Sequence, residues 1–318
     1  MNLPLPVARA LLHPFYRMTF HPRVPWRAQR MLVNAFSAGQ PMPRSSRVRT
    51  LRLGKRRAER VTVGPVTGPG AVLYLHGGGF TVGSPVTHRS LAAHLARATG
   101  RPVYVLDYRL APEHPCPAAL EDTLAALDDL ARHEGHATSS VVLAGDSAGG
   151  GIALAAAQHL AAPAGEHAGD GAPGRREVPA ALVLVSPWAD PGRVAEQRRD
   201  LVVSRAWGLA CAAAYLGTGD PSDPRYAPAR GDLTGLPPTY LHTNTDELLY
   251  AQCLDLAACL RRAGVTVRFR ESRELWHAAQ AQAGLVRQAA ESVRDIGSFL
   301  TEQWALPSEA EAVDATAD

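Results

Sequence analysis

The chain has 318 residues, 46% of them hydrophobic and 20% charged, and its 33 basic and 30 acidic residues leave a net charge of +3. This composition is typical of a globular enzyme with a large core, and so weak a charge balance gives no reason to expect nucleic acid as a partner. No run approaches the roughly 18 apolar residues of a membrane span and the N-terminus lacks the pattern of a signal peptide, so we expect a cytoplasmic protein without a stable membrane anchor.

Residues 1–45 precede the first predicted strand and combine prolines and arginines with a few helical stretches. From residue 71 onwards, strand and helix patterns alternate. Continuous apolar runs predict strands covered on both faces, at residues 71–75, 103–107, 141–144, 180–186, 239–243 and 265–270. Helical patterns lie between and after them, at residues 89–98, 118–133, 148–160, 248–263 and 280–304. The alternation predicts an α/β protein with a mostly parallel central sheet flanked by helices.

Three later segments fall outside this alternation. Residues 162–177 are rich in Gly, Ala and Pro and predict a surface loop, and residues 307–318 are small and acidic and predict a disordered tail. Residues 187–237 separate two predicted strands by far more than an ordinary connection. We expect this insertion to be functional, for example as a lid over a site.

The cysteines indicate neither metal nor redox chemistry. Cys116, Cys211, Cys253 and Cys259 form no C-x-x-C pair, and none has a histidine at zinc spacing. We therefore expect the four cysteines to be small apolar core residues of a protein in a reducing compartment. We expect no metal or organic cofactor.

The strongest chemical signal is the sequence GDSAG at residues 145–149, which matches the G-x-S-x-G pattern of a nucleophile elbow. It stands directly after one predicted strand and directly before a predicted helix. A serine on so tight a turn projects at the carboxyl end of the sheet, near the positive end of a helix. Ser147 is therefore the predicted nucleophile. A chance match in a chain with 28 glycines is the alternative, which the strand and helix context disfavours.

A glycine run follows an earlier predicted strand, in the sequence LHGGGF at residues 75–80. Consecutive glycines can turn backbone N–H groups towards a substrate, as an oxyanion hole requires, and the Ala148 N–H would supply the remaining donor. A phosphate-binding loop is the alternative. It is disfavoured because no G-K-[ST] follows and the glycines are contiguous.

Together these segments resemble the hormone-sensitive-lipase family of bacterial esterases. The resemblance rests on five motifs in family order: HGGGF at 76–80, DYRLAPEHP at 107–115, GDSAGG at 145–150, SPW at 186–188 and GLPP at 235–238. It implies an α/β-hydrolase fold over residues 46–306, with a helical cap built from an N-terminal segment at 1–45 and the insertion at about 187–237. It also implies that Gly78 and Gly79 provide the oxyanion N–H groups.

The predicted general base is His277, which is the last of the 12 histidines and follows the strand predicted at 265–270. In α/β-hydrolases the base comes last in the chain, and the acid follows an earlier strand. Here Asp246 and Glu247 compete after the strand predicted at 239–243. The commonest family pattern is Asp-Pro-Leu, and aligning Leu249 with that leucine favours Glu247, 30 residues before His277. Asp246 stays the alternative.

These residues predict two-step acyl transfer on a small-molecule ester. The resemblance implies short- to medium-chain carboxylic esters. Phe80, Trp188, Trp207 and Tyr215 are candidates for the substrate pocket or the cap, and each could equally be an ordinary core residue.

Several alternatives stay open. A biosynthetic enzyme on the same scaffold, such as a deacetylase, a dehydratase or a cyclase, could use the same oxyanion hole. A non-catalytic small-molecule receptor is disfavoured because serine, histidine and acid are all present. A membrane-surface helix within residues 1–45, in place of a cap helix, is disfavoured because Pro14, Pro22 and Pro25 limit its length. The oligomeric state is undetermined, with a homodimer left open.

Overall fold

The computed structural model describes residues 3–163, 177–196 and 200–305. The tail predicted at 307–318 lies outside the described residues, and so does the loop predicted at 162–177 apart from its ends. Within the described ranges, no helix is long and apolar enough to cross a membrane.

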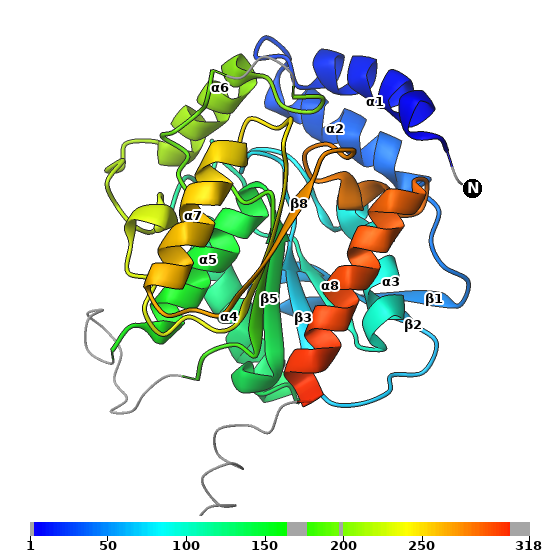
Figure 1. The fold of residues 1–318 in the computed structure, drawn as a ribbon, viewed down its shortest axis with the longest axis vertical. Helices are drawn as coiled ribbons and strands as arrows, with labels where there is room; N and C mark the ends of the chain where they lie inside the picture. The colour runs from blue at the N-terminus through cyan, green and yellow to red at the C-terminus, as the bar shows by residue number, and fades with distance from the viewer. Residues whose placement is uncertain (1–2, 164–176, 197–199, 306–318) are drawn as a thin grey trace, which may run out of the picture.

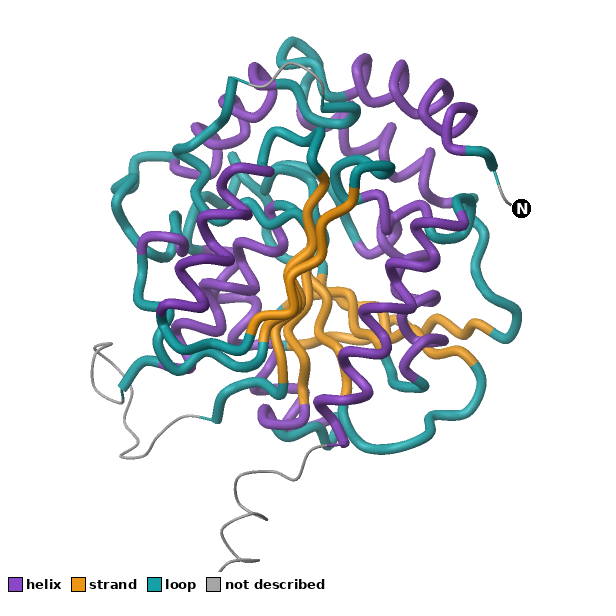
Figure 2. The backbone as a smooth tube through the Cα atoms, in the orientation of Figure 1, coloured by secondary structure: helices purple, strands orange, loops and turns teal. Residues whose placement is uncertain are grey.

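Over the described residues, one eight-stranded sheet forms the centre of the molecule (Figures 1 and 2). Its strand order is β1-β2-β4-β3-β5-β6-β7-β8, and all strands from β3 to β8 run parallel. The predicted mostly parallel sheet is therefore confirmed. The strands are β1 (Ser46–Leu53), β2 (Arg56–Val63), β3 (Ala71–Leu75), β4 (Val103–Leu106), β5 (Val141–Asp146), β6 (Ala181–Val185), β7 (Thr239–Asn244) and β8 (Val267–Ser272).

The hairpin of β1 and β2 was not predicted. β1 pairs antiparallel with β2, which pairs antiparallel with β4. β1 is an edge strand and is mostly exposed, with Arg47, Arg49 and Arg52 along it. Charged side chains are common on such edges because they prevent pairing with another chain. They also remove the continuous apolar run by which the buried strands were predicted.

Helices cover both faces of the sheet. α3 (Pro85–Thr99) and α8 (Arg287–Ala305) lie on one face, and α4 (Ala118–His133), α5 (Ala148–Ala161) and α7 (Tyr250–Arg262) lie on the other (Figure 1). Side chains alternate between the two faces along each strand. In β3, Val72 and Tyr74 pack in one apolar core, whereas Leu73 and Leu75 pack in the other.

The terminal helix begins later than predicted. Instead of one helix over residues 280–304, a short 3₁₀ turn at Ala279–Gln282 precedes α8. Gly284 lies between them, and a Cβ on Gly284 would come within 2.3 Å of the Pro41 carbonyl oxygen. The helix is therefore interrupted where the end of the chain packs against the N-terminal segment. Local sequence patterns could not predict this contact, because its two segments are far apart in the sequence.

α1 (Leu5–Thr19), α2 (Trp26–Ala38) and α6 (Arg205–Leu216) lie over the carboxyl ends of the strands, and we refer to these three helices as the cap (Figure 1). α1 and α2 come from the start of the chain, and α6 comes from the insertion between β6 and β7. Trp207 of α6 joins the two parts. Its ring stacks on Phe20 with centroids 4.4 Å apart, and its Nε1–H donates to Gln29 Oε1 over 2.8 Å.

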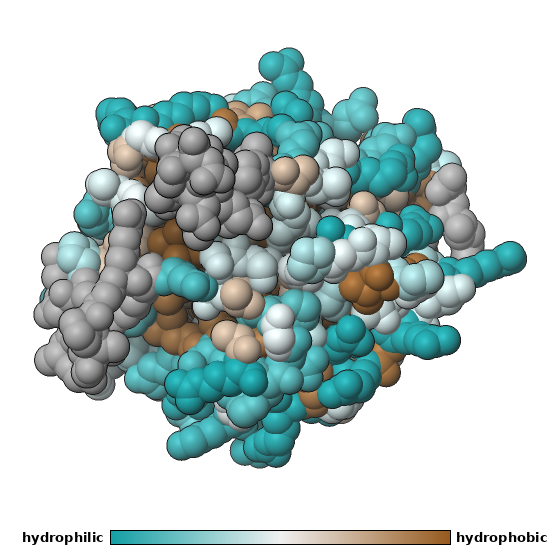
Figure 3. Space-filling model, turned by 90° about the horizontal axis from the view of Figure 1, so that it is seen from below, coloured by the Kyte–Doolittle hydropathy of each residue, from teal (hydrophilic) through white to brown (hydrophobic). Residues whose placement is uncertain are grey.

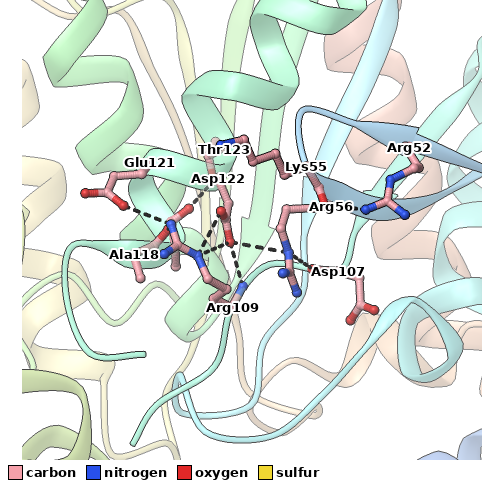
Figure 4. A network of polar contacts seen from close by, with 10 residues as sticks. Arg52, Lys55, Arg56, Asp107, Arg109, Ala118, Glu121, Asp122 and Thr123 are labelled. Atoms are coloured by element: carbon pink, nitrogen blue, oxygen red, sulfur yellow. Dashed lines mark hydrogen bonds and ion pairs between the residues drawn. The ribbon is translucent and has the colours of Figure 1, made fainter. Parts of the chain in front are cut away.

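A polar network fixes the segment after β4, which carries the DYRLAPEHP motif (Figure 4). Arg109 donates to Asp122 of α4 from its backbone N–H over 2.8 Å and from Nε over 3.0 Å. Arg56, at the start of β2, donates to the Asp107 carbonyl oxygen over 3.1 Å. The network ties the hairpin, β4 and α4 together, and so fixes the position of Tyr108 between them.

Candidate active site

Ser147 occupies the turn between β5 and α5 in a strained backbone conformation. Its φ is 51° and its ψ is −120°, a combination that residues with a side chain rarely adopt. The neighbouring strand and loop hold it there. The Ser147 N–H donates to the Val185 carbonyl oxygen over 2.9 Å, and the Ser147 carbonyl oxygen accepts from the Trp188 N–H over 2.8 Å. The strand–turn–helix context predicted for this serine is confirmed.

Two glycines leave room for this turn. A Cβ on Gly149 would lie 1.9 Å from the Leu75 carbonyl oxygen, and one on Gly145 would lie 2.4 Å from the Gly149 backbone. Both separations are far inside van der Waals contact. The elbow therefore packs directly on the end of β3, the neighbour of β5 in the sheet.

The glycine run after β3 lies beside Ser147. Gly78 and Gly79 have φ values of 127° and 58°, which glycine adopts without strain. Among the hydrogen bonds between described residues, none is donated by the N–H of Gly78 or Gly79. The Ala148 N–H lies in the first turn of α5, where N–H groups have no intrahelical partner. Unpaired N–H groups beside a nucleophile are what an oxyanion hole requires.

A buried carboxylate holds the glycine run against the elbow. Asp146 Oδ1 accepts from the Gly77 N–H and the Tyr74 hydroxyl, each over 3.0 Å, and lies 3.0 Å from His88 Nε2. Burial alone would raise the pKa of Asp146, but the charge and hydrogen bond of His88 and the hydrogen bond of Tyr74 hold it below its ordinary value. The second residue of GDSAG thus links the loop after β3 to the turn after β5.

His76, the first residue of the glycine motif, has a structural position. Its ring stacks on Tyr108 with centroids 4.2 Å apart, and the Tyr108 hydroxyl donates to the His76 carbonyl oxygen over 2.6 Å. Burial and repulsion by His88 lower the pKa of His76 to about 3, so the ring is neutral. The DYRLAPEHP motif therefore supports the glycine run through Tyr108.

Glu247 follows β7 and is fully buried. Its carboxylate accepts from the Ser186 and Thr243 hydroxyls, each over 2.7 Å, and from Asn244 Nδ2 over 3.1 Å. These three donors compensate for the loss of water around a buried carboxylate. Ser186 begins the SPW motif, so this motif holds Glu247 in place.

His277 faces Glu247 from the loop after β8. Its Nδ1 lies 3.5 Å from Glu247 Oε2, which is an ion-pair distance and is longer than a well-formed hydrogen bond. Burial disfavours the charged imidazole, but the ion-pair interaction with Glu247, together with the charges of Asp200 and Asp146, raises the pKa of His277 to about 9. Burial would likewise raise the pKa of Glu247, but its interactions with His277 hold that pKa below its ordinary value.

Asp246 lies apart from this pair. Its side chain is exposed, and it lines a separate surface hollow of about 580 Å³ together with Arg9, His13 and Arg17 of α1. Of the two competing carboxylates, the fold brings Glu247 to the imidazole.

A further buried carboxylate, Asp200, was not predicted. Its Oδ1 accepts from the N–H groups of Val202 and Val203, each over 2.8 Å, and its Oδ2 accepts from the Leu248 N–H over 2.9 Å. Because Leu248 follows Glu247 directly, Asp200 fastens the cap insertion to the loop that carries this carboxylate. Burial raises the pKa of Asp200 above its ordinary value. Asp200 and Leu248 are 48 residues apart, so this contact could not be predicted from a local sequence pattern.

A cavity of about 90 Å³ lies between the cap and the sheet, and Ser147 and His277 both line it. Gly78 and Gly79 form part of the same wall. A smaller apolar hollow of about 10 Å³ also reaches Ser147. Its other lining residues are Trp188, Val194, Val203, Trp207, Gly208, Leu248 and Leu249. An apolar wall around a few polar groups is typical of a site for a small organic ligand.

The four aromatic candidates lie in different places. Trp207 lines both cavities and Trp188 lines the smaller one. Phe80 and Tyr215 stack on each other with ring centroids 3.8 Å apart. They line neither of the two cavities that reach Ser147. The cavity of about 90 Å³ instead includes side chains that were not predicted, from α1, α2 and the residue directly after α1: Phe15, Tyr16, Phe20, Val33 and Phe36. Their concentration before residue 40 was the available sequence signal.

Comparisons with known proteins identify the fold and the family. A family described as having the alpha/beta hydrolase fold matches residues 72–281. The chain is 37% identical over 234 residues to an acetyl-hydrolase of Streptomyces hygroscopicus, a match that covers 72% of this chain and 74% of that protein. It is 30% identical over 268 residues to an esterase of Acinetobacter venetianus, with 82% of this chain and 84% of that protein covered.

Solved structures give the same result. A crystal structure of an esterase from the bacterial hormone-sensitive lipase family matches with a TM-score of 0.83 and 31% identity, covering 96% of this chain and 100% of that chain. An esterase/lipase from an uncultured bacterium matches with a TM-score of 0.81 and 30% identity, covering 94% and 99%. The chain therefore belongs to the bacterial hormone-sensitive-lipase family of hydrolases with the α/β-hydrolase fold.

Proposed function

We propose that this protein is a carboxylic ester hydrolase that acts on short- to medium-chain acyl esters through an acyl-enzyme intermediate. The observation that carries the proposal is the meeting of three features at one cavity. These are a serine on a strained elbow, a glycine run with unpaired N–H groups, and a buried His277–Glu247 pair.

In the first step, neutral His277 takes the proton of the Ser147 hydroxyl as its oxygen attacks the ester carbonyl carbon. The protonated imidazole then gives this proton to the leaving alkoxide, and the acyl group stays on Ser147. In the second step, His277 takes a proton from water, and the resulting hydroxide attacks the acyl carbonyl. The collapse of this second intermediate returns the proton to Ser147 and releases the carboxylic acid.

Each tetrahedral intermediate carries a negative oxygen. The N–H groups of Gly78, Gly79 and Ala148 are the proposed donors to it, and a single donor of this kind contributes about 3–4 kcal/mol to the transition state. Glu247 orients the imidazole and stabilises its charged form. Asp246 has no part in this mechanism.

We also propose that residues 1–45 and the insertion at 187–237 act together as the cap that shapes the acyl and alcohol sites. The cavity wall from α1, α2 and Trp207 supports this division. The two relatives, an acetyl-hydrolase and an esterase, support ester hydrolysis, and the first of them supports a small acyl group.

The test is hydrolysis of p-nitrophenyl acetate and p-nitrophenyl butyrate by the wild type and by Ser147→Ala. We expect turnover by the wild type and a loss of about 10⁴-fold or more in kcat in the variant, because the remaining site retains only binding and the oxyanion donors. A folded wild-type protein that turns over neither ester would exclude the esterase proposal.

A further inference from the structure

The outer surface of α1 and α2 is unusually apolar. Among the described residues, eleven large hydrophobic side chains are exposed, and seven of these belong to residues 7–42. They include the three most exposed of all, Met18 at 72%, Met31 at 65% and Leu11 at 61%. We call the exposed apolar residues of the two helices the cap face: Val7, Leu11, Met18, Met31, Leu32 and Phe36.

The cap face is not the side by which the helices pack on the protein. In α1 the buried residues are Ala8, Leu12 and Thr19. Ala8 and Leu12 belong to an apolar cluster with residues 275–289 of the loop and helix after β8. Val7, Leu11 and Met18 each precede one of these buried residues, so they lie on the adjoining face, about 100° around the helix, and they are exposed. A surface helix normally carries polar residues outside its buried stripe. α1 therefore has one apolar side that the fold uses and another that it leaves open.

The segment that carries the cap face has charges of one sign. Residues 1–45 contain six arginines and no aspartate or glutamate, whereas the whole chain has a net charge of only +3. Arg17, Arg23, Arg27 and Arg44 are exposed, and none of them takes part in an ion pair with another described residue. Arg30 is the arginine of this segment that is paired, with Glu113 over 2.7 Å.

We propose that the cap face docks on an anionic lipid surface. Apolar side chains that enter the boundary between headgroups and acyl chains, flanked by arginines that meet anionic headgroups, are the features by which helices bind in a membrane interface. A second copy of this chain fits the surface less well. A twofold dimer through the cap face would bring one acid-free, arginine-rich segment against another.

The cap face is continuous with the cavity. Phe15, Tyr16 and Phe36 line the cavity that contains Ser147, and Phe36 is also 38% exposed at the surface. Docking by this face therefore places a wall of the cavity at the lipid interface. Figure 3 shows the opposite end of the molecule, where hydrophilic residues lie around smaller hydrophobic patches.

The experiment is sedimentation of the full-length protein with vesicles of phosphatidylcholine, with and without phosphatidylglycerol. We expect binding to the anionic vesicles that weakens as salt is added, because salt screens the arginines. We expect a combined cap-face variant to bind the anionic vesicles at least about tenfold more weakly than the wild type. This variant carries Leu11→Ser, Met18→Ser, Met31→Ser, Arg23→Gln and Arg27→Gln. The matched control replaces exposed residues elsewhere: Val66→Ser, Leu254→Ser, Arg273→Gln and Arg287→Gln.

Docking and catalysis are separable in this design. Ser147→Ala is expected to bind vesicles as the wild type does, and the cap-face variant is expected to keep its turnover of dissolved p-nitrophenyl butyrate. Three results would overturn the proposal: no binding of the wild type to anionic vesicles, equal loss of binding in the cap-face and control variants, or a wild-type dimer in sedimentation velocity that the cap-face substitutions dissociate.

Discussion

Asp246 and Glu247 are neighbours in sequence with opposite surroundings. Glu247 is buried against His277, whereas Asp246 is exposed to solvent. Glu247→Gln keeps the shape but removes the charge that stabilises protonated His277, so we expect kcat/KM for p-nitrophenyl butyrate to fall on the order of 10²–10⁴-fold. Asp246→Asn is expected to stay within about twofold of the wild type. Equal losses in the two variants would contradict the assignment of Glu247.

The pH dependence of the reaction follows from the charges around His277. Only the neutral imidazole can accept the Ser147 proton, and the surrounding carboxylates raise the pKa of His277 to about 9. Below that pH the base is mostly protonated. We therefore expect kcat/KM to rise with pH and to reach half its limit near pH 9, well above the ordinary value of a histidine. A half-maximum near pH 6.5 would contradict this.

The variant Asp200→Asn tests how much of the raised pKa of His277 is due to Asp200, a residue of the insertion before β7. Asp200 is one of the charges that raise the pKa of His277, so its removal should move the half-maximum of kcat/KM to lower pH. An amide can still accept the Leu248 N–H bond through its oxygen. Asp246→Asn is the matched control, because the same change at an exposed carboxylate should leave the pH profile in place. Coinciding profiles of Asp200→Asn and the wild type would count against the role of Asp200.

At the scale of elements, β3 and α5 can pack closely because α5 carries a glycine, Gly149, where the two meet. A Cβ on Gly149 would lie 1.9 Å from the Leu75 carbonyl oxygen, and the backbone of a buried central strand cannot move aside. We expect Gly149→Ala to lower the free energy of unfolding by roughly 3 kcal/mol or more, measured by urea denaturation.

The control is Gly39→Ala at the C-terminal end of α2, where an added Cβ meets nothing within 4 Å. This change should alter stability by about 0.5 kcal/mol or less. Wild-type stability of Gly149→Ala would mean that β3 and α5 are not packed as described.

At the scale of the whole molecule, the cavity belongs neither to the sheet nor to the cap alone. Its catalytic side comes from loops after β3, β5 and β8, and its opposite side comes from α1, α2 and α6. A space of about 90 Å³ with an adjoining apolar hollow of about 10 Å³ suits a short acyl chain. We expect kcat/KM to be highest for acetyl to butyryl esters and about tenfold or more lower for dodecanoyl esters. A profile that rises to dodecanoyl would contradict this.

Much of this architecture was predictable from sequence because buried parallel strands have a local signature. Continuous apolar runs marked β3 to β7, and the glycines around Ser147 marked the elbow, since only glycine fits where one backbone touches another. β8 was predicted with them as a strand covered on both faces, but its arginines alternate with apolar residues and it is only partly buried, because it lies at the edge of the sheet. The mostly parallel α/β sheet, the position of Ser147 between a strand and a helix, and the existence of an insertion before β7 followed from patterns along the chain. The α/β-hydrolase fold was implied by the resemblance of the five motifs to a known family.

The tertiary structure decided what depends on contacts between distant segments. β1 carries arginines on an exposed edge, so its pairing with β2 has no apolar pattern to report it. The aromatic wall from α1 and α2, the tie from Asp200 to Leu248, and the placement of Glu247 rather than Asp246 beside His277 each need two segments to meet. Sequence determines which residues can do chemistry, but burial and direction, which set their pKa values and partners, exist only once the chain is packed.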